Sequence, residues 1–313
     1  MGHSRKQFLG GVSAFALTPV ASRAQAQLQK LRIGSGPADA YAEGWIAIDM
    51  GFFKNAGLDA QYYPFDSGSL ATAAVLGGMC DIVCGTTMTV ATAVSRGLPL
   101  GIVAPAAVNT KSGPQALLCV RKDGPIHNAK DMVGKTIGVN VLGTSVDLAV
   151  QAWLAENGVD PKSTKFVEVL AAEVGAAIDR GTIDAFAMGE PALSYALRRN
   201  NVRVLADPMP AIAPRFLYAA WYTTATFYKN NPETVKRFQA AISAAGRWGN
   251  NNHAASAVIV AKYTKLPVAD ITTMKRATFA DTLSTGEIQP LLDAAARFKF
   301  LSRPMTASEI ILR

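Results

Sequence analysis

The chain has 313 residues, of which half are hydrophobic, and it carries a formal net charge of +8. The positive charge is spread along the chain rather than gathered in one basic run, which argues against a nucleic-acid-binding surface. The length suits two lobes of ordinary size, each with enough apolar residues for its own core.

Residues 1–26 have the order of a secretory signal. Arg5 and Lys6 precede an apolar run of 13 residues from Phe8 to Val20, and small residues follow at 24–26. The run is too short to cross a bilayer, which needs about 20 residues. We therefore predict export to the periplasm, by the Sec route or by the twin-arginine route, whose signal the segment resembles with Lys6 in place of the second arginine. Removal of the segment leaves 28 basic and 23 acidic residues, a net charge of +5.

After this segment, short apolar stretches alternate with helical patterns, as is typical of an α/β protein. Strands are predicted at 31–34, 58–63, 81–84, 100–104, 116–121, 135–141, 165–170 and 183–188. Helices are predicted from about 41 to 51, at 70–76 and 90–95, from 146 to 153 and at 171–180. From Pro232 onward the pattern is almost wholly helical, with Gly246, Pro267 and Pro290 as its interruptions.

The three cysteines, Cys80, Cys84 and Cys119, are interpreted as small core residues. Cys80 and Cys84 lie four positions apart at the start of a predicted strand, which places them beyond disulfide reach. The two histidines after the signal segment, His127 and His253, are isolated, so no metal site is predicted. The sequence also holds no nucleophile elbow, Walker loop or zinc-protease motif, so no cofactor is predicted.

Several ordered segments resemble one family of binding proteins. Residues 51–58 (GFFKNAGL) resemble a signature of the nitrate/sulfonate/taurine-type, NMT1/THI5-like solute-binding proteins of ABC importers. Similar family elements are found in order along nearly the whole chain after residue 26: 67–69 (SGS), 77–82 (GGMCDI), 96–100 (RGLPL), 131–139 (DMVGKTIGV), 181–185 (GTIDA), 189–191 (GEP) and 231–233 (NPE). Each element alone is weak, whereas the ordered set is specific.

The resemblance implies a two-lobed periplasmic-binding-protein fold of type II, in which each lobe is a mixed sheet flanked by helices. The chain would cross twice between the lobes. Lobe one would comprise residues 28–114 plus 222–313, and lobe two residues 115–221. A ligand would lie in the cleft between them and be trapped by closure of the hinge.

Small residues follow several predicted strands at the points where helices begin. Backbone N–H groups at a helix start favour an oxyanion, glycine permits close approach, and a hydroxyl adds a neutral donor. Because ligands of open α/β sheets bind at the carboxyl ends of strands, these loops are candidate ligand contacts. The alternative is that each hydroxyl only caps its helix. The candidates are Gly36, Ser67, Gly68, Ser69, Thr86, Thr87, Gly143, Thr144 and Ser145.

Other residues are single candidates. Glu190 follows an apolar strand and could accept a hydrogen bond from a ligand, or instead cap the turn before Pro191. Tyr41, Trp45 and Trp221 could form walls for a ring or alkyl group, with core packing as the alternative for the two tryptophans. Asn109 could add a polar contact near the first crossing. Arg215 could supply a counter-charge for a carboxylate near the second, with an ordinary exposed arginine as the alternative.

Taken together, the sequence predicts a periplasmic carrier that captures a small anionic organic solute and delivers it to an ABC permease and its ATPase. The solute classes are sulfonate, nitrate and carboxylate, including aromatic acids. We expect a monomer that binds no nucleic acid and catalyses no reaction. An enzyme similar to thiamine-pyrimidine synthases, which use histidine and clustered cysteine, and an extracytoplasmic sensor are the alternatives.

Overall fold

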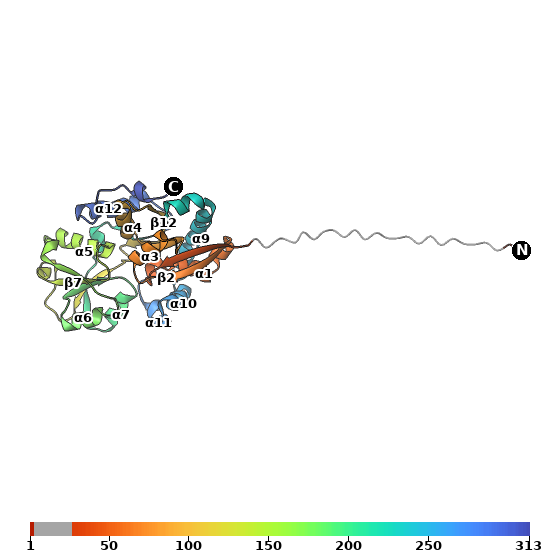
Figure 1. The fold of residues 1–313 in the computed structure, drawn as a ribbon. Helices are drawn as coiled ribbons and strands as arrows, with labels where there is room; N and C mark the ends of the chain where they lie inside the picture. The colour runs from red at the N-terminus through yellow and green to blue at the C-terminus, as the bar shows by residue number, and fades with distance from the viewer. Residues whose placement is uncertain (3–26) are drawn as a thin grey trace.

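The computed structural model describes residues 1–2 and 27–313, and its helices and strands, from Gln29 onward, form two α/β lobes side by side (Figure 1). The predicted export signal lies outside this part of the chain except for its first two residues. Within residues 27–313, no helix is both long enough and apolar enough to span a bilayer.

The first lobe is built on a five-stranded sheet with the strand order β2-β1-β3-β12-β4. Strands β2, β1 and β3 run parallel, and β12 is antiparallel to both of its neighbours. The strands are β1 (Gln29–Ser35), β2 (Leu58–Pro64), β3 (Ile82–Thr86), β4 (Leu100–Pro105) and β12 (Ala219–Thr224). The helices of this lobe are α1 (Glu43–Asp49), α2 (Phe52–Asn55), α3 (Gly68–Leu76), α4 (Thr87–Ser95), α8 (Ala225–Asn230), α9 (Pro232–Asn251), α10 (His253–Thr264), α11 (Val268–Thr273) and α12 (Thr285–Arg297).

The second lobe repeats the plan with the strand order β10-β6-β9-β7-β8. Its strands are β6 (Leu117–Arg121), β7 (Thr136–Val139), β8 (Lys165–Glu168), β9 (Ala185–Met188) and β10 (Val202–Ala206). Strands β7, β8 and β9 are parallel, and β6 is antiparallel to β9 and β10. Its helices are α5 (Ser145–Glu156), α6 (Val174–Arg180) and α7 (Ala192–Arg198).

A small sheet, β11-β5-β13, joins the lobes. Strand β5 (Ala107–Thr110) lies in the outgoing crossing and β11 (Arg215–Leu217) in the returning one, and the two pair antiparallel. Strand β13 (Thr278–Phe279) adds a third strand from the C-terminal part. Two crossings fixed together in this way form the geometry of a hinge.

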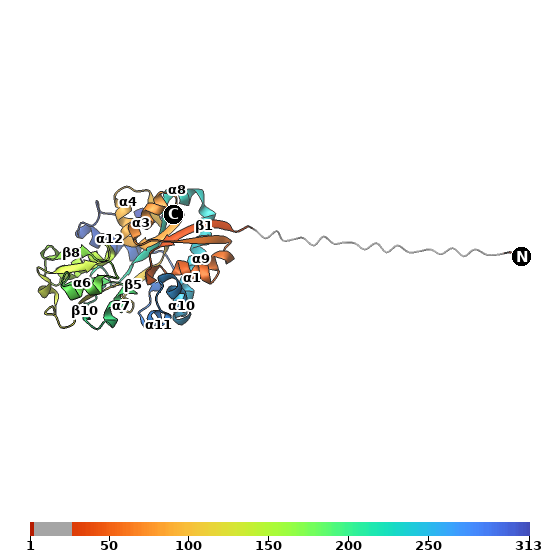
Figure 2. The ribbon, with the colours of Figure 1, turned by 60° about the horizontal axis from the view of Figure 1, so that its bottom comes forward.

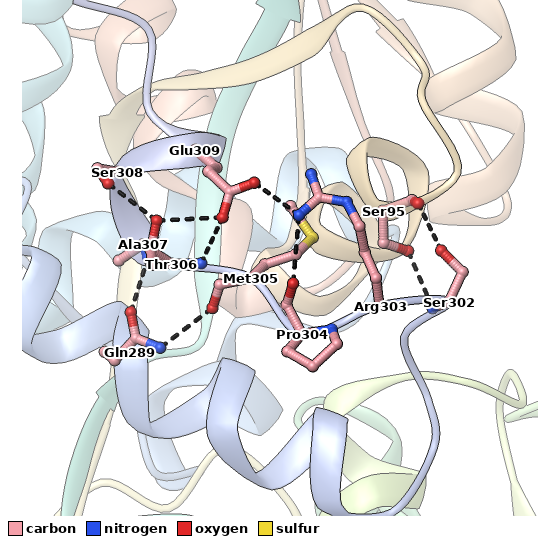
Figure 3. Close-up of polar contacts among 10 residues, drawn as sticks. All are labelled: Ser95, Gln289, Ser302, Arg303, Pro304, Met305, Thr306, Ala307, Ser308 and Glu309. Atoms are coloured by element: carbon pink, nitrogen blue, oxygen red, sulfur yellow. Dashed lines mark hydrogen bonds and ion pairs between the residues drawn. The ribbon is translucent and has the colours of Figure 1, made fainter.

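The C-terminal segment lies across the outer edge of the first sheet. Gln289 of α12 accepts a hydrogen bond from the N–H of Ala307 and donates one to the carbonyl of Met305 (Figure 3). Ser302 binds Ser95 at the end of α4, through its N–H and its hydroxyl. The segment ends with Ile311 in a bridge to Ile102 of the edge strand β4.

The predicted strand and helix order is confirmed as a mixed α/β fold with two main sheets. Every predicted strand is present. The sequence did not predict β12, although it lies inside the first sheet. Because β12 begins at Ala219, the chain returns to the first sheet before residue 222. The division of the chain into lobe one (28–114 plus 222–313) and lobe two (115–221) stays a proposal.

Two predicted helix interruptions are wrong. Gly246 lies inside the 20-residue helix α9, and Pro290 lies inside α12. A side chain at Gly246 would come within 2.6 Å of Glu43 Oε1, so the glycine allows α9 to pack closely against α1. Packing, rather than chain termination, accounts for this glycine.

Candidate functional site at the junction of the two lobes

Two of the predicted hydroxyls cap helices of the first lobe. Ser67 Oγ accepts a hydrogen bond of 3.3 Å from the N–H of Leu70, and Thr86 Oγ1 accepts one of 3.2 Å from the N–H of Thr89. A Cβ on Gly68 would lie 3.2 Å from Thr89 Oγ1, so the starts of α3 and α4 are neighbours. Ser69 is exposed. For Ser67 and Thr86, capping is therefore the role the structure displays.

Thr87 differs from these caps. It is fully buried at the first position of α4, and its Oγ1 has no hydrogen-bond partner. Its backbone N–H donates to the carbonyl of Tyr218, and the N–H of Tyr218 donates to Ala107 of β5. The hydroxyl is thus a buried, unpaired donor held next to the hinge.

The corresponding loop of the second lobe also holds one unpaired hydroxyl. Gly143 has a positive φ of 75° and donates its N–H to Asp147 Oδ2 at 2.9 Å. Thr144 Oγ1 donates to the carbonyl of Val141. Ser145 is fully buried and its Oγ has no partner. The next residue, Val146, packs against the cores of both lobes, so the start of α5 lies at their junction.

A third unpaired donor comes from the hinge. Asn109 on β5 is fully buried, and its Oδ1 accepts a hydrogen bond of 3.0 Å from the N–H of Gln115. The Nδ2 group of the same side chain has no partner. Gln115 in turn donates its amide to the carbonyls of Val108 and Gly113. This network fixes the Asn109 side chain and leaves one amide donor free.

Glu190 lies two residues before α7, on the second lobe. Its carboxylate accepts hydrogen bonds from the N–H of Ser194 at 3.0 Å and from the Ser194 hydroxyl at 2.8 Å. Both bonds come from the first turn of α7, after Pro191, and a ligand contact by Glu190 stays a prediction. Burial raises the pKa of Glu190, and the nearby Asp39 carboxylate of the first lobe adds to the rise, while Arg198 opposes it. Asp39 belongs to the loop that follows β1.

Gly36 and Tyr41 belong to that loop. A Cβ at Gly36 would lie 3.6 Å from the Tyr41 ring, which is ordinary contact. Burial raises the pKa of Tyr41 well above its usual value, and the nearby Tyr218 contributes to the rise. The Tyr41 hydroxyl is accordingly neutral and able to donate or accept a hydrogen bond.

The expected ligand roles of Trp221 and Arg215 are not supported by their positions. Trp221 is fully buried in the first-lobe core, where its ring packs against Phe238 and its Nε1 donates to Glu43 Oε2 at 3.2 Å. A side chain enclosed in this way lines no ligand surface. Arg215 lies on β11 with its Nε 2.5 Å from Glu287 Oε1, so its charge is already paired. Trp45 is also buried, stacked at 5.2 Å on Tyr263.

The sequence interpretation missed one buried ion pair in this region. Asp39 accepts from Arg276 Nε at 2.8 Å and from the N–H of Ala277. Arg276 also donates to Ser256 and to the carbonyl of His253. The pair ties the loop after β1 to β13 and thereby to the hinge sheet. An aspartate in a polar loop and an arginine 237 positions later carry no sequence signal of pairing.

The cysteines are buried and free, as expected. Burial raises the pKa of Cys80 to about 11 and that of Cys119 to about 12, so both thiols are protonated and poor nucleophiles. Within residues 27–313 no three His, Cys, Asp or Glu side chains are grouped as metal ligands.

A cavity of about 240 Å³ lies elsewhere, between β4 and α9. None of the candidate residues lines it; its lining residues are Val103, Ala104, Pro105, Gln239, Ile242, Ser243, Ala280, Asp281 and Leu283. The candidate site therefore rests on the unpaired donors of Thr87, Asn109 and Ser145, which come from two lobes and the hinge.

Comparison with known proteins agrees with this architecture. The chain is 29% identical over 200 residues to the taurine-binding periplasmic protein of Escherichia coli K12, a match that spans 63% of this chain and 59% of that protein. The aliphatic sulphonate binding protein SsuA of Escherichia coli has the same fold, with a TM-score of 0.76 and 18% identity over 90% of this chain and 97% of SsuA. The nitrate-binding protein NrtA of Synechocystis PCC 6803 gives a TM-score of 0.74 and 17% identity over 91% of this chain and 85% of NrtA.

These structural neighbours are periplasmic binding proteins, which confirms the two-lobed fold that the sequence predicted. The protein-family model described as NMT1/THI5 like matches residues 41–253, about two thirds of the chain. With the ordered motifs, the two sheets and the paired crossings already described, this match shows that the chain belongs to the NMT1/THI5-like family.

Proposed function

We propose that this protein is an extracytoplasmic carrier that binds a small organic anion between its lobes and delivers it to an ABC permease with its ATPase. The predicted signal segment and the periplasmic relatives support a periplasmic location. A monomer suffices for this task, since both lobes that would enclose the solute belong to one chain.

The observation that carries the proposal is the set of unpaired donors at Thr87, Asn109 and Ser145. Leaving one buried donor unsatisfied costs about 1–3 kcal/mol, so a ligand acceptor that met these donors would gain that energy on binding. A ligand rich in oxygen acceptors would satisfy all three. The helix starts of α4 and α5 would add partial positive charge for the same ligand.

The pairing of the arginines near the hinge sheet bears on which class of solute the protein would bind. Arg215 on the hinge strand β11 and Arg276 next to the hinge strand β13 are each paired with a carboxylate. We therefore propose that neutral donors hold the solute, which favours a sulfonate or carboxylate with an organic body. Tyr41 would contact that body.

The test is a thermal-shift screen of the exported protein, residues 27–313, against alkanesulfonates, taurine, nitrate and aliphatic and aromatic carboxylates. A ligand at 100 times its dissociation constant stabilises the native state by about 2.7 kcal/mol, which raises the melting temperature by several degrees. Stabilisation by one chemical class without consumption of the compound supports the proposal. No stabilisation across the panel, or turnover of the compound, refutes it.

A pair of variants of the same helix sharpens the test. Thr87→Val removes the unpaired hydroxyl at the start of α4, and we expect it to weaken binding of the stabilising compound about tenfold, the effect of one lost hydrogen bond to a charged group. Thr92 on the same helix has a buried unpaired hydroxyl outside the candidate loops, so Thr92→Val is the matched control. Equal affinities for the two variants, measured by calorimetry, would exclude Thr87 from the site.

A further inference from the structure

One ion pair bridges the two lobes. Arg198 at the end of α7, on the second lobe, lies 3.0 Å from Asp270 of α11, on the first lobe, measured from Nη2 to Oδ2. Figures 1 and 2 show α7 and α11 next to each other from two directions. The two side chains are 41% and 29% exposed, so the pair lies at the surface and is reached by solvent ions.

No other ion pair of residues 27–313 makes this connection. The remaining pairs lie within one lobe or, like Arg215–Glu287, fix a hinge strand to the first lobe. Away from the hinge sheet, the lobes also meet where Leu148 and Ala149 of α5 join the first-lobe core, an apolar contact. The ion pair and the apolar contact thus involve different helices of the second lobe.

Helix α7 links this ion pair to the candidate site. Glu190, just before its start, accepts hydrogen bonds from Ser194, and Arg198 ends the same helix. Across the junction, Asp270 of α11 binds Arg198. A rigid movement of the second lobe about the hinge sheet would displace Glu190 and Arg198 together, because Glu190 lies two residues before α7 and is hydrogen-bonded to Ser194 within it.

We propose that Arg198 and Asp270 form a latch that holds the two lobes in the arrangement described above, without bound solute as well as with it. A solvent-exposed ion pair of this kind corresponds to a two- to fivefold change in the ratio of latched to unlatched molecules. Salt screens such a pair, so the ratio falls as ionic strength rises. The latch does not depend on the chemical class of the solute.

The experiment measures the distance between the lobes in dialysed protein without added solute. Spin labels are attached to cysteines introduced at two exposed positions, Lys54 on the first lobe and Lys162 on the second, and pulsed dipolar spectroscopy gives the distance distribution. The three native cysteines are buried, so labelling is confined to the introduced thiols.

Arg198→Glu and Asp270→Arg should each lower the ratio of short to long label-to-label distances at least twofold. The double variant, which carries both substitutions and so exchanges the two charges, should restore the wild-type ratio. Arg199→Glu is the matched control. It makes the same charge change one residue later, but Arg199 binds Asp179 within the second lobe at 2.8 Å. The latch would be overturned if the single variants left the distance distribution unchanged, or if Arg199→Glu changed it equally. It would also be overturned if the double variant did not restore the wild-type distribution. None of these results depends on the solute screen, so failure of the latch and failure of the proposed function are distinguishable.

Discussion

A buried carboxyl group in the first lobe gives the sharpest prediction of stability. Glu43 on α1 is fully buried, with Oε2 accepting the Trp221 hydrogen bond and Oε1 without a partner. Burial raises the pKa of Glu43 well above its usual value of 4.5, the Asp281 carboxylate adds to the rise, and the Trp221 hydrogen bond opposes it. The native protein therefore keeps a proton on Glu43 that the unfolded chain releases.

This difference sets the sign of the pH dependence. The stability contributed by protonated Glu43 is fully present below the unfolded pKa, near 4.5, and is lost as the pH rises towards the native pKa. Each pH unit in that window costs up to about 1.4 kcal/mol. Glu43→Gln keeps the shape of the side chain and an oxygen acceptor for Trp221, but it has no proton to lose. As the pH rises above 4.5, the variant should therefore gain stability relative to the wild-type protein, by up to about 1.4 kcal/mol per pH unit.

The assay is urea unfolding at a series of pH values from 4.5 to 8, with Glu156→Gln as a control at an exposed position of α5. We expect the free energies of unfolding of the wild type and Glu43→Gln to diverge with increasing pH, and those of the wild type and the control to stay parallel. Parallel curves for Glu43→Gln would refute the reasoning, because they would mean that Glu43 ionises alike in both states.

Two further predictions concern packing and charge in the same lobe. Gly246→Ala places a Cβ 2.6 Å from Glu43 Oε1, so it should lower the free energy of unfolding by about 1–3 kcal/mol; an unchanged urea midpoint would contradict this packing. Asp39→Ala leaves the Arg276 guanidinium buried without a counter-charge, and breaking a buried pair in this way costs about 3–5 kcal/mol. The double variant with Arg276→Met should recover much of that loss in calorimetric melting, and an additive loss would show that the charge is not the cause.

The sequence predicted the alternation of strands and helices well because most strands end at glycine or a turn signal. Strand β12 was missed for a physical reason. All of its residues except the last, Thr224, are buried, so it shows neither the polar alternation of a half-exposed strand nor a flanking glycine. The lobe boundary proposed at residue 222 lies within this strand.

The candidate site was predictable only as a set of loops. Serine and threonine at a helix start serve equally well as caps and as ligand donors, and sequence alone does not separate the two roles. The structure separates the two roles. The Ser67 and Thr86 hydroxyls accept hydrogen bonds from the helices that they cap, whereas the Thr87 and Ser145 hydroxyls are buried and have no hydrogen-bond partner. The pairing of Arg215 with Glu287 likewise depends on two segments 72 residues apart.

The C-terminal segment has a practical consequence for anyone who handles this protein. Strand β4 is an edge of the first sheet, and an uncovered edge invites pairing with another chain. Leu312 covers it by donating its N–H to the carbonyl of Ile102 and by placing its side chain against Gly101. Loss of residues 302–313 would uncover this edge and expose it to pairing with another chain.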